Sequence, residues 1–148
     1  MTRKKQAMEY FLQGYNCCQS VVLAFKDVLD IDEKTLIKIS GSFGGGIGRL
    51  REVCGAVSGM AMVLGLLDGY EKPEETEKKA ELYEKIQSLA KDFEKENGSI
   101  ICRQLLHLDV EHDEPVPEKR TAAYYHSRPC GDLVGYAAEL LEDYLENR

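Results

Sequence analysis

The chain has 148 residues, of which 43% are hydrophobic and 30% are charged, and its net charge at pH 7 is -7. This length is enough to bury one sizeable core, so we expect residues 1–148 to form a single domain. The acidic balance argues against a protein that binds nucleic acid, because contact with the phosphate backbone needs a basic face.

Residues 8–29 have apolar side chains three and four positions apart, which is the helical period. Gly14 and Asn16 interrupt the pattern. Glycine often follows a helix end and asparagine often caps a helix start. The segment therefore fits either two helices, the second beginning at Cys17, or one continuous helix.

A short helix is predicted next, in residues 30–40, with Asp30 or Asp32 as its N-cap. The glycine-rich stretch GSFGGGIG follows at residues 41–48. Beyond it, Arg49–Leu67 is strongly apolar and predicts a buried central helix.

The second half of the chain also predicts helices. Residues 73–97 form a highly charged helix with a narrow apolar stripe, a proline in its first turn and Gly98 after its end. A short helix in residues 99–109, an acidic loop with prolines in residues 110–119 and a last helix in residues 130–148 follow. The expected fold is all-α, a single-domain bundle of about six helices with a glycine-rich loop before the central helix.

No segment predicts export or membrane insertion. The N-terminal basic residues are not followed by the apolar region of a secretory signal. The most apolar run, residues 53–67, has 15 residues, whereas a membrane-spanning helix needs roughly 20. We therefore expect a cytoplasmic protein without a membrane span.

Cysteine is the residue type in this sequence that best indicates a functional site. Five cysteines are many for a cytosolic chain, and both the odd number and the compartment disfavour a structural disulfide framework. No C-x-x-C pair occurs, so any site must be assembled from distant segments. The cysteines are Cys17, Cys18, Cys54, Cys102 and Cys130.

Four of these cysteines lie near predicted helix starts. The first turn of a helix has unpaired N–H groups and a partial positive charge, which favours a thiolate over a thiol. One helix terminus supplies at most about 2 kcal/mol, enough to lower the pKa of a thiol from about 8.5 to about 7. Arg51, Arg103 and Arg128 each lie within three residues of a cysteine and could add to this field. The four cysteines are Cys17, Cys54, Cys102 and Cys130.

Two alternatives stay open on the residues alone. Cysteine packs well as a small buried hydrophobe, so each of these cysteines could be inert. In the first helical segment, the apolar stripe by itself would choose Cys18 rather than Cys17 for the inner face.

The glycine-rich stretch is not a nucleotide-binding motif. It contains neither G-x-G-x-x-G nor the G-K-[ST] that ends a phosphate-binding loop. Glycine permits positive φ and close approach of another backbone, so we interpret these glycines as a tight mount for Cys54. They are Gly44, Gly45 and Gly46 in the loop, and Gly55 and Gly59 in the helix.

Several segments together resemble the C_GCAxxG_C_C family of redox-active proteins. They are GYNCCQSVVLAF, GSFGGGIGRLREVCGAVSGMAMVLGL, CRQLL and RPCGDLVGYAAELLEDYL, and the likeness extends from about Phe11 to Tyr144. The four cysteines of the family pattern fall by position on Cys17, Cys54, Cys102 and Cys130. The family usually has a small residue such as alanine after the first cysteine, where this chain has Cys18, so the choice between Cys17 and Cys18 stays open.

The resemblance implies a redox role, carried either by a thiol–disulfide couple or by an iron–sulfur centre that the four cysteines would ligate. A structural zinc site is the alternative metal reading. A different class of function is a non-catalytic helical binding or scaffold module with inert buried cysteines. The redox partner is not identified by the sequence, and a homodimer is left open.

Overall fold

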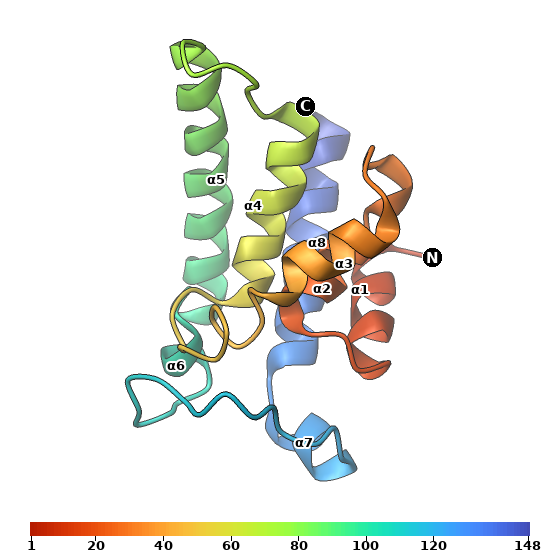
Figure 1. The fold of residues 1–148 in the computed structure, drawn as a ribbon, viewed down its shortest axis with the longest axis vertical. Coiled ribbons are helices and arrows are strands. Elements are labelled where there is room, and N and C mark those ends of the chain that lie inside the picture. Colours follow the sequence, from red (N-terminus) through yellow and green to blue (C-terminus); the bar gives the residue numbers. More distant parts are fainter.

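Eight α-helices make up the fold, and the computed structural model describes all of residues 1–148 (Figure 1). The helices of seven residues or more are α1 (Arg3–Leu12), α2 (Cys17–Leu23), α3 (Glu33–Gly41), α4 (Gly55–Asp68), α5 (Thr76–Asn97) and α8 (Cys130–Asn147). The shorter ones are α6 (Cys102–Leu105) and α7 (Ala122–Ser127), and a 3-10 turn, Lys26–Val28, follows α2. The prediction of an all-α bundle with about six main helices is confirmed.

The helices surround one hydrophobic core. In Figure 1, α4 and α8 lie in the middle, the long α5 stands on one side, and α1, α2 and α3 lie on the other. The contacts agree with this view, since α1 packs along α8 and α2 packs against α4. No helix is both long and apolar enough to cross a membrane, and the apolar α4 is instead buried along much of its length.

The first two helices are separate, which decides between the two arrangements that the sequence allowed. Asn16 caps α2 by a reciprocal pair of hydrogen bonds with Gln19, its side chain accepting from the Gln19 N–H. Its side-chain amide also donates to the carbonyl of Gly41 at 3.0 Å. The cap therefore fixes both the start of α2 at Cys17 and the position of the end of α3.

The predicted start of the central helix at Arg49 is wrong, because α4 begins at Gly55. We call residues 42–53 the glycine loop. Arg49 and Arg51 have φ of 66° and 60°, which belongs to a left-handed turn and not to an α-helix. The N–H of Arg51 donates to the carbonyl of Gly45 at 3.0 Å, so the loop closes on itself before the helix starts.

Three smaller differences concern the second half of the chain. Pro73 lies in a turn before α5 and not in its first turn. The helix predicted in residues 99–109 has only four residues, Cys102–Leu105, and its N-cap is Ile101. The helix α7 was not predicted. Its N-cap is Thr121, whose hydroxyl accepts a hydrogen bond from the backbone N–H of Tyr124.

One end of the bundle holds the irregular segments. The glycine loop, α6, α7 and the chain between these two helices all lie at the lower end of Figure 1. We call residues 106–121, which join α6 to α7, the acidic loop. The starts of α2, α4 and α8 point to the same end, so this is where the cysteines at helix starts meet.

Candidate functional site

Four cysteines from four elements line one cavity. Cys17, Cys102 and Cys130 are the first residues of α2, α6 and α8, and Cys54 is the N-cap of α4. All four contribute to the wall of a cavity of about 310 Å³, which we call the cysteine cavity. Their predicted place at helix starts is therefore confirmed, and the fold brings the four starts together.

Backbone hydrogen bonds join the chain segment that contains Cys54 to the segment that contains Cys102. The end of the glycine loop and the residues before α6 run antiparallel for a short distance and form one isolated β-bridge. Within it, the N–H of Cys54 donates to the carbonyl of Ile100 at 2.8 Å, and the N–H of Cys102 donates to the carbonyl of Glu52 at 2.6 Å. No short-range sequence pattern predicts this pairing of the two segments.

Two glycines allow the cysteine-bearing segments to come this close. A Cβ added at Gly46 would lie 2.8 Å from the Cβ of Cys102 and 2.6 Å from the backbone N of Glu52. A Cβ added at Gly55 would lie 3.0 Å from the Cβ of Cys17. Side chains at these two positions would push the elements apart, so glycine here sets the distance between the cysteine segments.

The other predicted glycines also serve close contact. A Cβ at Gly44 would overlap the side chain of Asn16, and one at Gly59 would lie 2.8 Å from the Cβ of Val21, where α2 crosses α4. Gly45 has φ of 66° and so occupies a backbone conformation that favours glycine. Gly59 lies away from the cavity, whereas the other four predicted glycines line it.

Cys17 and Cys18 point to different places. Cys17 is partly exposed on the cavity wall, while Cys18 is fully buried in the core, with its Sγ 3.6 Å from the Sδ of Met62. Burial raises the pKa of Cys18 to about 12. The apolar stripe had favoured Cys18 for the inner face, and that face is the core and not the cavity.

Of the three arginines predicted to act on the cysteines, two line the cavity. Arg51 is buried, and its guanidinium donates to the Sγ of Cys102 at 3.6 Å. Arg128 also lines the cavity. Arg103 instead pairs with Glu52 at 3.0 Å and lies outside the cavity wall.

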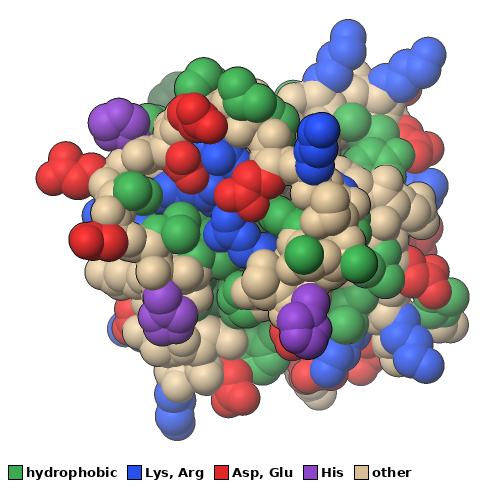
Figure 2. Space-filling view, turned by 90° about the horizontal axis from the view of Figure 1, so that it is seen from below, with side chains coloured by type: hydrophobic (Ala, Val, Ile, Leu, Met, Phe, Trp, Pro, Cys, Tyr) green, Lys and Arg blue, Asp and Glu red, His purple; other side chains and the backbone are tan.

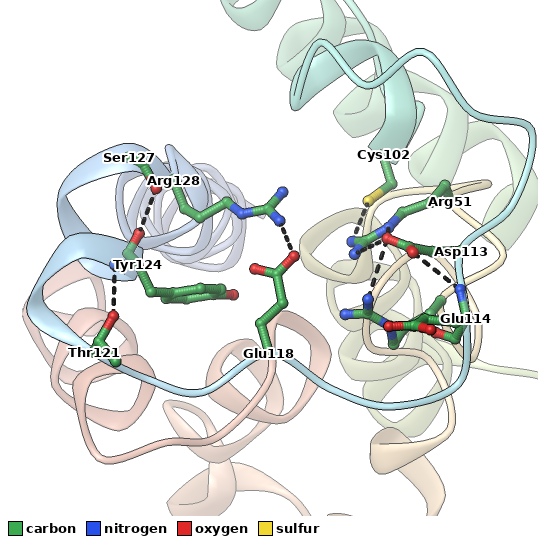
Figure 3. Close-up of polar contacts among 10 residues, drawn as sticks. Arg51, Cys102, Asp113, Glu114, Glu118, Thr121, Tyr124, Ser127 and Arg128 are labelled. Atoms are coloured by element: carbon green, nitrogen blue, oxygen red, sulfur yellow. Dashed lines mark hydrogen bonds and ion pairs between the residues drawn. The ribbon is translucent and has the colours of Figure 1, made fainter.

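The acidic loop passes over these arginines. Its Asp113 pairs with Arg51 at 3.0 Å, and its Glu118 pairs with Arg128 at 2.6 Å. In Figure 3, Glu118 and Arg128 face each other on one side, while Arg51, Asp113 and Cys102 form a separate group on the other side. Figure 2, which looks onto this end of the molecule, shows basic side chains in the middle of the face with acidic ones beside and over them.

Cys130 is the thiol that the site makes most acidic. A side-chain hydrogen bond from Cys17 lowers the pKa of Cys130, and the charges of Arg128, Arg120 and Arg51 lower it further against the opposing effect of burial. The same hydrogen bond raises the pKa of Cys17, and burial adds to that rise. The pair is therefore suited to share one proton, with the thiolate on Cys130 and the thiol on Cys17.

The other two cavity thiols stay protonated more readily. Burial raises the pKa of Cys54 to about 12, although the backbone N–H groups at the start of α4 oppose the rise. Burial also raises the pKa of Cys102, and the hydrogen bond from Arg51 opposes that rise. A helix start alone thus does not produce a thiolate, because desolvation exceeds its field at these two positions.

Arg120 is a cavity residue that the sequence did not reveal. It donates to the backbone carbonyls of Phe11 at 2.9 Å and Tyr15 at 3.0 Å, and its guanidinium lies 5.0 Å from the ring centre of Tyr124. It lies ten positions before Cys130 at the end of the acidic loop, so no short-range spacing connects it to a cysteine. Only the path of the loop brings it to the cavity wall.

The side chains of the cavity that could ligate a metal are mainly cysteine thiols. No group of three or more His, Cys, Asp or Glu side chains is placed so as to hold a metal ion. The three histidines are exposed and lie outside the cavity wall, namely His107, His112 and His126. Cysteine sulfur is the ligand type of iron–sulfur centres, but the four cavity thiols are not placed as such a ligand group in this structure.

Comparison with known proteins identifies one family. The family model described as "Putative redox-active protein (C_GCAxxG_C_C)" matches residues 15–144, which is most of the chain and includes all four cavity cysteines. No curated protein and no solved structure matches the chain.

Proposed function

This chain belongs to the C_GCAxxG_C_C family, and we propose that it is redox-active and that its redox chemistry takes place at the cysteine cavity. The proposed site residues are Cys17, Cys54, Cys102 and Cys130. In the leading form of the proposal, Cys17 and Cys130 alternate between two thiols and one disulfide.

The observations that support this form are that Cys17 and Cys130 line the same cavity and that each thiol shifts the pKa of the other, upward for Cys17 and downward for Cys130. In thiol–disulfide exchange the thiolate is the nucleophile, and Cys130 is the cavity cysteine whose pKa is lowered. Cys17 then acts as the resolving thiol, because it lines the same cavity and is the group with the largest effect on the pKa of Cys130. Oxidation of the pair removes two electrons and two protons and forms one S–S bond.

The test is a redox titration of the purified protein in thiol–disulfide buffers, with free thiols counted by mass after alkylation. Wild type should lose two alkylatable thiols in one reversible step. Cys17→Ala and Cys130→Ala should each abolish that step, because either change removes one half of the couple.

Cys18→Ala is the matched control, since Cys18 is adjacent in sequence but lies in the core. It should leave the two-thiol step intact. Loss of the step in Cys18→Ala, or its persistence in Cys130→Ala, would contradict the assignment. Slow alkylation of all five thiols without any redox step would support an inert helical module instead.

A second candidate is an iron–sulfur centre held by all four cavity cysteines, and the observation that favours it is that all four line one cavity. Their side chains would have to draw closer together to bind it, because no three of them are placed as metal ligands in this structure. A disulfide uses only two of the four. Such a centre, when bound, supplies one-electron transfer. Arg51 and Arg128 would stabilise its negative charge, and the glycine loop would keep Cys54 and Cys102 together.

Anaerobic purification followed by iron and sulfide analysis separates the two candidates. A coloured protein with iron and acid-labile sulfide in wild type, and loss of both in Cys54→Ala, would support the cluster. Colourless wild type without iron, together with a reversible two-thiol step, would support the disulfide couple.

A further inference from the structure

The arginines of the chain are concentrated at the cysteine cavity. The chain has seven arginines and twelve lysines, as counted in the sequence. Four of the arginines and none of the lysines line the cavity, and its wall has a single carboxylate, that of Glu118. In an acidic protein, this distribution concentrates positively charged side chains around the cavity. The four residues are Arg49, Arg51, Arg120 and Arg128.

Arginine differs from lysine in the anions that it recognises. Its planar guanidinium matches a carboxylate with two parallel hydrogen bonds, whereas lysine offers a single rotatable charge. A wall with arginine as its only cationic residue type is therefore suited to a carboxylate or a similar flat anion.

Arg128 already binds a carboxylate, which is the side chain of Glu118 in the same chain. Its side chain is 14% exposed and pairs with Glu118 at 2.6 Å through one terminal nitrogen. The Glu118 side chain is 41% exposed and comes from the acidic loop, so it can leave without unfolding any helix. Its carboxylate occupies the position that a ligand carboxylate would take.

A second guanidinium faces the cavity from the opposite side. Arg51 is buried, touches the Sγ of Cys102 and is fixed by Asp113 (Figure 3). Arg120 is fixed by two backbone carbonyls, so its position does not depend on a ligand. A small molecule between Arg51 and Arg128 would thus meet positive charge on two sides and cysteine sulfur on the wall.

We infer that the cysteine cavity binds a small disulfide that bears carboxylates, with one carboxylate replacing Glu118 on Arg128 and the S–S bond presented to Cys130. This inference rests on the proposed thiol–disulfide function and names its substrate class. The cavity volume of about 310 Å³ lies at the lower end of the range for small-molecule sites, which suits a ligand of a few carbon atoms per arm.

The exchange balances without any further oxidant. The Cys130 thiolate attacks one sulfur of the bound disulfide RSSR, so that a Cys130–S–S–R bond forms and RS⁻ leaves. The Cys17 sulfur then gives up its proton and attacks the Cys130 sulfur, which forms the Cys17–Cys130 disulfide and releases the second RS⁻. The two electrons lost by the cysteines end on the two released thiols, which take up two protons.

Three disulfides with identical two-carbon arms test the inference, because they differ only in the charge of their end groups. Dithiodipropionate is a dianion, hydroxyethyl disulfide is neutral and cystamine is a dication. The measurement is the rate at which each oxidises the Cys17–Cys130 pair, divided by its rate with free cysteine at the same pH. Wild type should prefer the dianion over the dication by about tenfold, as one charge-assisted hydrogen bond predicts.

Three variants test which residue causes the preference for the dianionic disulfide. Arg128→Met should remove most of the tenfold preference, and the ratio is independent of any general change in the reactivity of Cys130. Glu118→Gln removes the competing carboxylate and should raise the preference for the dianion by about threefold. Lys119→Met is the matched control, since this exposed lysine lies beside Glu118 but not on the cavity wall, and it should change nothing.

The outcomes separate this inference from the proposed function. Equal normalised rates for all three disulfides would overturn the inference and leave the cysteine couple standing. Failure of every disulfide to oxidise the pair would overturn both. An equal loss of rate for all three disulfides in Arg128→Met, with the ratio kept, would also overturn the inference, because it would assign Arg128 a purely structural role.

Discussion

The core and the cysteine cavity both contain cysteine, but only the cavity lowers the pKa of one of its thiols. Cys18 is surrounded by apolar groups, and burial raises its pKa to about 12. Cys130, at the cavity, has a lowered pKa because a thiol and three arginines face it. The difference teaches that neither burial nor a helix start decides thiol chemistry here, since both regions are buried and Cys54 at a helix start also has a raised pKa.

The two regions also differ in what their glycines and loops do. In the core, Gly59 lets α2 approach α4 and contributes to stability alone. At the cavity, Gly46 and Gly55 set the distance between cysteine-bearing segments. Substitutions in the core should therefore change stability, and substitutions at the cavity should change reactivity as well.

The largest expected effect is a core truncation. Leu141 in α8 is fully buried, so Leu141→Ala should lower the free energy of unfolding by about 3 kcal/mol, through lost burial and the void left behind. Denaturant unfolding measures this loss. Alkylation of Cys130 in the folded protein should be unchanged. Leu66→Ala, at a 45% exposed leucine of α4, is the control and should cost less than about 1 kcal/mol.

The next effect compares two glycines of the glycine loop. Both have positive φ, but a Cβ at Gly46 would meet the backbone of the next turn, whereas one at Gly48 has nothing within 4 Å. Gly48→Ala should cost about 1 kcal/mol from the backbone conformation alone. Gly46→Ala should cost about 3 kcal/mol and also alter the alkylation rate of Cys102. Equal losses of stability in the two variants would contradict this prediction, because they would show that the glycine loop can move to make room for a Cβ at Gly46.

A pH effect separates the core thiol from the cavity pair. Because the folded-state pKa of Cys18 lies above its unfolded value of 9.0, the unfolded chain releases its proton first as the pH rises. Stability should therefore fall from about pH 9 toward pH 12. Between pH 8 and 10 the contribution of Cys18 to this fall is about 1.4 kcal/mol.

Cys18→Ala tests that contribution through the slope of stability against pH. The variant is less stable at every pH because it removes a buried side chain, but its stability should fall less steeply above pH 9. An unchanged slope would contradict the raised pKa. The slope is compared with wild type, since Cys17 and Cys54 also have raised pKa values and contribute to the fall in both proteins.

The smallest effect concerns the acidic loop. Asp113 pairs with Arg49 at 3.1 Å and with Arg51 at 3.0 Å, and its side chain is 27% exposed. Asp113→Asn should lower the free energy of unfolding only slightly at neutral pH, because the pair is partly exposed to solvent. The hydrogen bond from Arg51 lowers the pKa of Asp113, so wild type has this stability above the ordinary carboxyl pKa and loses it as the pH falls through the lowered value.

Wild type and Asp113→Asn should therefore converge in stability at acid pH. A gap that persists there would mean that the asparagine disturbs the loop for another reason. Salt should narrow the gap at neutral pH, because the pair is only partly shielded from solvent.

Much of the fold could be predicted from local patterns. The spacing of apolar residues fixes the helical class, and the caps Asn16 and Asp32 mark helix starts that the structure contains. Gly98, with φ of 90°, ends α5 as expected. The predicted helix at Arg49 failed because a loop that closes by left-handed turns leaves no trace in apolar spacing, and α7 was missed because six residues are too few for a periodic signal.

The sequence by itself determined that this is an all-helical, cysteine-rich chain of the C_GCAxxG_C_C family, with four cysteines at helix starts, because these are local properties of residue type and spacing. Only the tertiary structure decided that Cys17 and not Cys18 lines the cavity, because one residue along a helix is a turn of about 100°. It also decided which arginines act on the thiols, because Arg120 and Arg51 reach the cavity through loops whose path depends on contacts distant in sequence.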